Sequence, residues 1–116
     1  MDIYKMTDSH LKNFATPYLK QLVAACNNKD WDKFSEHFRA SGKTPDAKAN
    51  VENQWENNPG LCAFKQNFEF MGSLRKSDHV ATIWKMYNDD TTDEILGVLC
   101  FEYENDVVKV HTYRVF

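Results

Sequence analysis

His111 and Tyr113 are the pair of residues in this 116-residue chain best suited to acid–base chemistry. One residue separates them in a segment of alternating polarity, and in a β-strand such residues point to the same side. An imidazole beside a phenol can serve as general base and hydrogen-bond donor toward a carbonyl or hydroxyl substrate. The alternative is that both side chains lie near an open sheet edge, half buried and without a catalytic role. The sequence therefore leaves open whether the protein is an enzyme.

Cys100 is expected beside His111 on the neighbouring strand, and a Cys–His pair is also a potential nucleophile and base. No Asn or Asp is placed to orient the imidazole, so chance proximity is the simpler explanation. Cys26 and Cys62 complete an odd set of widely spaced cysteines without metal-ligand spacing. We expect three reduced, buried thiols in a cytoplasmic protein, with no metal and no cofactor.

Apolar and aromatic residues of the same region are candidates for the wall of a ligand site, with a few polar partners. The predicted ligand-binding residues are Trp55, Gln66, Phe68, Phe70, Thr82, Trp84, Met86 and Cys100. At strand spacing such residues more often form ordinary core. The remaining histidines, His10, His37 and His79, lack ligand spacing and are expected to be solvated. The acidic loop 89–94 lacks the glycine and the ligand order of a calcium-binding loop, and is interpreted as a solvated turn.

The elements that must position these residues are strands in the second half of the chain. Alternation of aromatic and β-branched residues with polar ones, interrupted by polar turns, predicts four antiparallel strands. Their ranges are 64–74, 80–88, 95–104 and 107–116. Asn105-Asp106 is a plausible two-residue hairpin turn between the last two. The loop of the middle hairpin is long, so its register is not fixed by the sequence.

Matching apolar and charged partners across the outer hairpins predicts their registers. The expected pairs are Arg75–His79, Leu74–Val80, Phe70–Trp84, Glu69–Lys85, Phe68–Met86, Glu102–Lys109, Phe101–Val110 and Cys100–His111. Two sheet faces follow. The first carries Phe64, Gln66, Phe68, Phe70, Val80, Thr82, Trp84, Met86, Val98, Cys100, His111 and Tyr113. The second carries Met71, Ile83, Tyr87, Leu99, Phe101, Tyr103, Val108, Val110 and Thr112. Because both faces are apolar at the centre, the second is expected to meet another copy of the chain.

Three helices are expected before the sheet. An apolar stripe predicts a first helix over residues 9–27, which continues as one bent helix through Pro17. Asp30 is expected to cap a short aromatic helix containing Trp31, Phe34 and Phe38. Thr44-Pro45 is typical of a cap followed by the first helical residue, and begins a third helix with Trp55 on its apolar side. The sequence therefore predicts an α+β fold.

This order of elements resembles the nuclear-transport-factor-2-like superfamily, also known as the ketosteroid-isomerase-like or cystatin-like α+β cone. The resemblance rests on the long first helix, the aromatic helix 30–38, the third helix and the closing strand 107–116. It covers nearly the whole chain and carries no diagnostic motif. It implies three N-terminal helices packed on a curved four-stranded antiparallel sheet, a conical pocket, and dimerisation through the outer sheet face. The carboxylates that enzymes of the superfamily place in the cone have no clear counterpart here, and the Gln-x-Val-x-Gly signature of cystatin inhibitors is absent.

Composition limits the function classes. Residues 1–116 are expected to form one domain, long enough for a core without disulfides or metal. The net charge of −3, without a basic cluster, gives no support for nucleic-acid binding, and no apolar run reaches membrane-spanning length. We expect a homodimer that binds a small apolar or aromatic ligand between helices and sheet. The alternatives are an isomerase-, dehydratase- or hydrolase-like enzyme using His111 and Tyr113, and a protein-interaction module using the outer sheet face.

Overall fold

The computed structural model describes residues 2–116 and has an α+β fold with the helices first and the sheet second. The helical half contains the 3-10 turns Ile3–Lys5, Ala40–Gly42 and Pro59–Cys62, and the α-helices α1 (Asp8–Asn27), α2 (Trp31–Ser35) and α3 (Pro45–Asn57). The strands are β1 (Glu69–Arg75), β2 (Val80–Met86), β3 (Ile95–Glu104) and β4 (Val107–Val115). They form one antiparallel sheet in the order β1-β2-β3-β4, so the predicted meander is confirmed.

The first helix begins one residue before the predicted start. Thr7 is its N-cap and accepts a hydrogen bond from the amide of His10, which satisfies one of the free donors of the first turn. The predicted apolar stripe is buried along its whole length, from Leu11 to Cys26. The helix continues through Pro17, as expected, because burial of this stripe outweighs the hydrogen bond that proline cannot donate.

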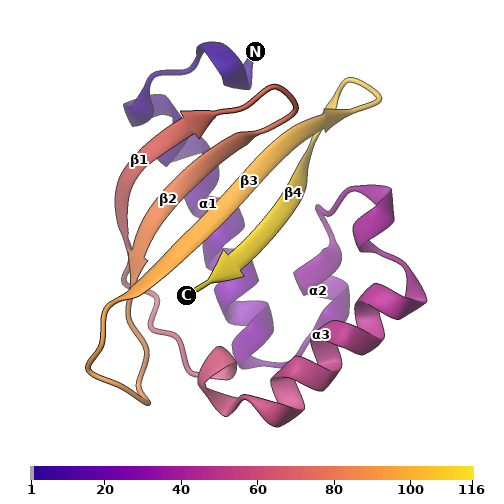
Figure 1. The fold of residues 1–116 in the computed structure, drawn as a ribbon, viewed down its shortest axis with the longest axis vertical. Helices are drawn as coiled ribbons and strands as arrows, with labels where there is room; N and C mark the ends of the chain where they lie inside the picture. The colour runs from indigo at the N-terminus through magenta and orange to yellow at the C-terminus, as the bar shows by residue number, and fades with distance from the viewer. Residues whose placement is uncertain (1) are drawn as a thin grey trace.

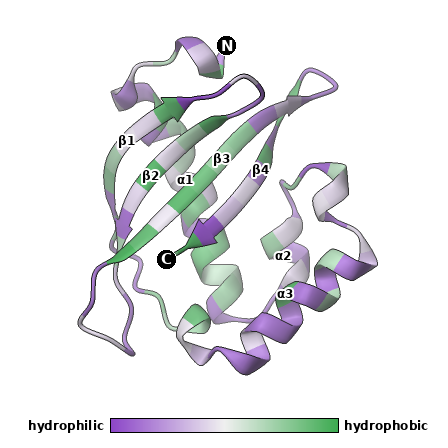
Figure 2. Cartoon of the chain, in the orientation of Figure 1, coloured by the Kyte–Doolittle hydropathy of each residue, from purple (hydrophilic) through white to green (hydrophobic). Residues whose placement is uncertain are grey.

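The other two helices have the predicted caps. The Asp30 side chain accepts from the amide of Lys33 at the start of α2. Thr44 accepts from the amide of Ala47, with Pro45 at the first helical position of α3. Only Trp55 of α3 is fully buried, and Figure 2 shows this helix as largely hydrophilic.

The elements form a sheet with helical cover on one side. In Figure 1 α1 runs behind the sheet, whereas α2 and α3 lie beside β4 at the open end of the meander. The stretch just after α2 is joined to the edge of β4: the Val110 amide donates to the His37 carbonyl at 2.7 Å, and the Arg39 amide donates to the Val110 carbonyl at 3.1 Å. The helical half is therefore fixed to the last strand, although a long stretch of sequence separates them.

The first hairpin follows the predicted register at one end only. Phe70 faces Trp84 and Glu69 faces Lys85, as expected. A bulge between Phe70 and Gly72 then inserts one residue, so Leu74 faces Ala81 and not Val80. The predicted pairs Leu74–Val80 and Arg75–His79 are wrong, because the bulge turns Leu74 away from the core.

The last hairpin shows the same pattern. Asn105 and Asp106 have φ values of 53° and 64°, as a type I′ turn requires, and the pairs Phe101–Val110 and Glu102–Lys109 are confirmed. A second bulge lies between Cys100 and Phe101, where β4 contributes His111 as an additional residue. Cys100 therefore faces Thr112, and the predicted pair Cys100–His111 is wrong.

The two sheet faces differ from the predicted sets in β3 and β4. The inner face, which packs on α1, carries Val80, Thr82, Trp84, Met86, Leu99, Phe101 and Val110, all buried. The outer face carries Ile83, Val98, Cys100 and His111. The prediction assigned Leu99, Phe101 and Val110 to the face of Ile83, and Val98, Cys100 and His111 to the face of Trp84. These assignments are wrong, because the middle hairpin pairs Trp84 with Gly97 and Ile83 with Val98.

The core joins this inner face to α1, and Figure 2 shows the strands β2 and β3 as predominantly apolar. Phe14 and Tyr18 of α1 contact Phe101 edge to face, with ring centroids 5.2 and 5.1 Å apart. Thr82 is the fully buried polar residue of the inner face: its hydroxyl donates to the Leu99 carbonyl at 2.7 Å and accepts from the Trp84 indole at 2.9 Å. Both polar groups are thus satisfied inside the core.

Candidate functional site

A pocket of about 570 Å³ opens between α3 and the edge of β4. It lies where the helical half diverges from the sheet, beyond the two hydrogen bonds that join Val110 to residues 37 and 39. The volume is in the range of small-molecule sites. The pocket is lined by Cys26, Phe34, Phe38, Arg39, Ser41, Gly42, Asn50, Val51, Gln54, Trp55, Asn58, Leu61 and residues 110–116.

The inner wall of the pocket is aromatic, with one hydroxyl. Phe34 contacts Trp55 edge to face at 5.4 Å between ring centroids, and Tyr113 at 6.2 Å. Burial raises the pKa of Tyr113 well above its usual value, so its hydroxyl stays protonated and can donate a hydrogen bond. This hydroxyl makes no hydrogen bond within residues 2–116 and is open to the pocket. The inner wall therefore offers aromatic surface and one available donor.

Cys26 lies beside this hydroxyl and is no candidate nucleophile. Burial raises the pKa of its thiol to about 12, against a smaller opposing effect of the Trp55 indole. Cys26, Cys62 and Cys100 are all unpaired in the described chain, and Cys62 is only partly buried. A protonated thiol contributes packing and weak polarity to the pocket wall.

The rim of the pocket is polar. α3 contributes Asn50 and Gln54, which are exposed and hydrogen-bonded to each other at 3.3 Å. Arg39 adds positive charge and is also 3.5 Å from the Glu102 carboxylate, whereas Arg114, although it borders the pocket, pairs with Val98 of the outer face. A ligand with an apolar body and a polar or anionic edge would match this division.

Backbone groups of β4 add further hydrogen-bonding capacity. Leu96 and Phe116 exchange both of their backbone hydrogen bonds, which fixes the alternation along this part of the ladder. Since Val98 pairs with Arg114 and Leu99 with Tyr113, the N–H and C=O groups of Tyr113 and Val115 point away from β3, along the edge that borders the pocket. The pocket thus combines one side-chain donor with a free strand edge.

The structure brings together only part of the predicted site. Tyr113 and Trp55 meet in the pocket. His111 does not join Tyr113, because the bulge places its ring on the outer face while Tyr113 pairs with the buried Leu99. Its main chain still borders the pocket. The two residues therefore lack the common face on which the acid–base hypothesis depended.

The other predicted ligand residues lie away from the pocket. Phe68 and Phe70 pack edge to face on Trp84, Met86 is fully buried, and both hydrogen-bonding groups of Thr82 are used within the core. Gln66 is exposed and donates to the Lys20 carbonyl at 3.1 Å. Cys100 is buried on the outer face beside Thr112, and burial raises the pKa of its thiol.

Sequence reasoning missed the helical side of the pocket. Phe34, Arg39, Asn50 and Gln54 come from segments interpreted as helices that cover the sheet, with no chemical signal of their own. One available signal was the composition of α3, in which Trp55 and Val51 are the only large apolar residues and most of the others are polar. A helix of that kind is typical of a rim and not of a core layer.

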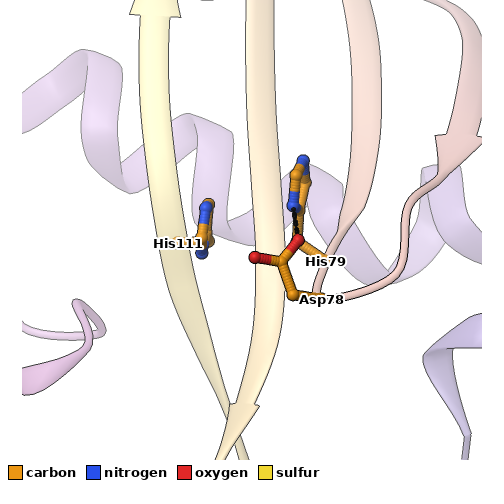
Figure 3. A group of neighbouring side chains, drawn as sticks. All are labelled: Asp78, His79 and His111. Carbon is orange, nitrogen blue, oxygen red and sulfur yellow. Dashed lines mark hydrogen bonds and ion pairs between the residues drawn. The ribbon is translucent and has the colours of Figure 1, made fainter.

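A second group of titratable side chains lies on the outer face. Figure 3 looks onto the sheet from the side opposite α1, and shows His111 of β4 and His79, which immediately precedes β2, on either side of β3, with Asp78 next to His79. The two imidazole rings are stacked, with centroids 4.5 Å apart and an interplanar angle of 7°. Asp78 Oδ1 lies 2.7 Å from His79 Nδ1. His79 was expected to be solvated, but the fold places it against His111.

No family model, curated protein or solved structure matches the chain. None of the helices within residues 2–116 combines the length and the apolar character needed to cross a membrane. Function is therefore argued from the geometry alone.

Proposed function

We propose that this domain binds a small, partly apolar molecule in the pocket between α3 and β4. The observation that carries the proposal is the Tyr113 hydroxyl, which stays protonated in an aromatic wall and has no acceptor among residues 2–116. This hydroxyl is open to the pocket, so a ligand acceptor would replace water as its hydrogen-bond partner and contribute about 0.5–1.5 kcal/mol. The pocket volume of about 570 Å³ leaves room for such a molecule.

The lining defines the class of ligand. Phe34 and Trp55 favour a flat aromatic or alicyclic body, and Tyr113 favours a carbonyl or other acceptor at its inner end. Arg39 and the amides of Asn50 and Gln54 at the rim favour an anionic or polar outer edge. The domain would then be a binding module of the cone type. The order of helices and strands, and a pocket at the divergence of helix and sheet, support that assignment to the nuclear-transport-factor-2-like arrangement.

Binding of the aromatic sulfonate 1-anilinonaphthalene-8-sulfonate, followed by calorimetry, tests the proposal. Gln54→Trp places a large side chain at the pocket rim and should weaken binding by at least about tenfold, which corresponds to 1.4 kcal/mol. The control is Asn53→Trp, an exposed neighbour on the same helix that does not line the pocket. Tyr113→Phe should also weaken binding while leaving the circular dichroism spectrum unchanged. Equal affinities for the two tryptophan variants would refute the proposed location.

The outer sheet face supports a second proposal, that two copies of the chain associate through it. Met71, Leu74 and Leu96 are 60%, 53% and 41% exposed on this face, with Ile83 and Val98 between them. Exposed apolar side chains grouped on a single sheet face are typical of a surface covered by a partner, and a second copy is the simplest one.

Light scattering after size-exclusion chromatography tests this association. The wild-type protein should be a dimer, Leu74→Asp should shift it to monomer, and Lys12→Asp on the exposed side of α1 should leave it dimeric. A monomeric wild-type protein would contradict self-association and favour a different chain as the occupant of this face.

A further inference from the structure

The outer face holds a compact set of metal-ligand atoms at the hairpin end of the sheet. One carboxylate oxygen of Asp78 and one ring nitrogen each of His79 and His111 all lie within 4.8 Å of one another. Asp78 and His79 come from the connection between β1 and β2, and His111 comes from the bulge in β4 (Figure 3). Residues far apart in the sequence are thus brought together by the sheet, and their chemistry is that of a two-histidine, one-carboxylate donor set.

A second observation concerns His111 alone. Its Nδ1 atom is buried and is the one such side-chain atom in residues 2–116 that has no hydrogen-bond partner. The nearest acceptor, Glu102 Oε2, lies 3.2 Å away, close enough for an ion pair but outside hydrogen-bond geometry. An unsatisfied buried nitrogen is unfavourable unless something absent from the polypeptide satisfies it. A cation would do so, and the Glu102 carboxylate beside His111 adds negative charge at this point.

The surrounding charge favours a cation. Asp78 and Glu102 contribute two carboxylates next to the imidazoles, and Arg39, 3.5 Å from Glu102 Oε1, compensates only one of them. In its neutral form each imidazole offers one nitrogen lone pair. The cluster therefore combines negative charge with nitrogen lone pairs. The hydrogen bond between Asp78 and His79 already holds two of the metal-ligand residues next to each other.

We propose that Asp78, His79 and His111 bind a divalent transition-metal ion of the zinc class, with water in the fourth position and Glu102 beside His111 as an outer partner. Nitrogen and carboxylate ligands at about 2.0–2.2 Å are the usual environment of Zn²⁺. Tetrahedral ligands at that distance lie about 3.4 Å apart, and the lone pair of an imidazole nitrogen lies in the plane of its ring. The cluster must therefore contract on binding, and the stacked rings must rotate out of their parallel arrangement. Asp78 and His79 can move toward the ion because they lie in the connection between two strands, whereas His111 is held by the sheet.

Calorimetric titration of the tag-free protein with ZnCl₂ tests the site, with Co²⁺ as a spectroscopic probe. We expect one ion per chain and a visible absorption band typical of four-coordinate Co²⁺. His79→Ala should weaken Zn²⁺ binding by at least about tenfold and remove the band, as expected when a ligand is lost. Asp78→Asn and Glu102→Gln should weaken binding less.

Two histidines outside the cluster provide matched controls. His10→Ala and His37→Ala should leave the affinity and the Co²⁺ spectrum unchanged, because neither residue belongs to the cluster. His79 lies outside the strands, so its alanine variant should fold, and an unchanged circular dichroism spectrum checks this. The proposal is overturned if the wild-type protein binds no Zn²⁺, or if His79→Ala binds as tightly as wild type. Loss of binding in either control variant would equally overturn it.

Discussion

The hydrogen-bonded pair Thr82–Trp84 gives a quantitative test of how the core of the sheet is held. Thr82→Val keeps the shape of the side chain but removes its hydroxyl. The Trp84 indole N–H, 2.9 Å from that hydroxyl and buried, then has no acceptor, and the Leu99 carbonyl loses a donor at 2.7 Å. The buried indole N–H without an acceptor lowers the free energy of unfolding by about 1–3 kcal/mol, and the lost hydrogen bond to Leu99 lowers it by about 0.5–1.5 kcal/mol. We expect a loss of about 2–4 kcal/mol in the free energy of unfolding.

A double-mutant cycle separates the two contributions. In a Trp84→Phe background the indole N–H is absent, so Thr82→Val should cost only the bond to Leu99, about 1 kcal/mol. Urea unfolding followed by far-ultraviolet circular dichroism measures all four proteins without relying on tryptophan fluorescence. Thr82→Ser, which keeps the hydroxyl, should retain most of the stability. Equal costs of Thr82→Val in the two backgrounds would refute the reasoning, because the indole would then not depend on this hydroxyl.

Three further predictions concern the backbone and the thiols. Gly97→Ala should destabilise the fold by about 1–3 kcal/mol in a thermal melt, because the added alanine Cβ would overlap the buried Met86 sulfur. An unchanged melting temperature would contradict this prediction and show that the core can adapt. Asp106→Gly should stabilise it by up to about 1 kcal/mol, because φ is 64° there and glycine carries no penalty at positive φ; a loss of stability would contradict the turn geometry. At pH 8 iodoacetamide should modify Cys62 first, because Cys62 is the only one of the three described cysteines that is not buried. Cys26 should react about a thousandfold more slowly than an unperturbed thiol, because the raised pKa of Cys26, about 12, leaves little thiolate. Mass spectrometry of the labelled peptides checks this order.

The two bulges explain most of the strand residues whose sheet face was predicted wrongly from the sequence. Alternation assigns a side to every residue of a strand, but one inserted residue reverses the assignment beyond it. His111 is the inserted residue of β4, so Tyr113 reaches the inner face and the pocket while His111 joins the outer cluster. In β1 the bulge before Gly72 likewise exposes Leu74. The candidate site was therefore predicted in part: Tyr113 and Trp55 line the pocket, whereas His111 borders it but has its ring on the outer face.

Local sequence patterns were enough to predict the caps Thr44 and Asp30, the apolar stripe of α1, and the Asn105-Asp106 turn. Each depends on neighbours within a few residues, so composition and spacing are sufficient. Tertiary structure alone decided the register of the middle hairpin, the divergence of α3 from β4 that opens the pocket, and the contact between His79 and His111. These features depend on packing between segments that are far apart in the sequence, and on bulges that shift the register of the strands. A local sequence pattern does not specify which segment a strand will pack against.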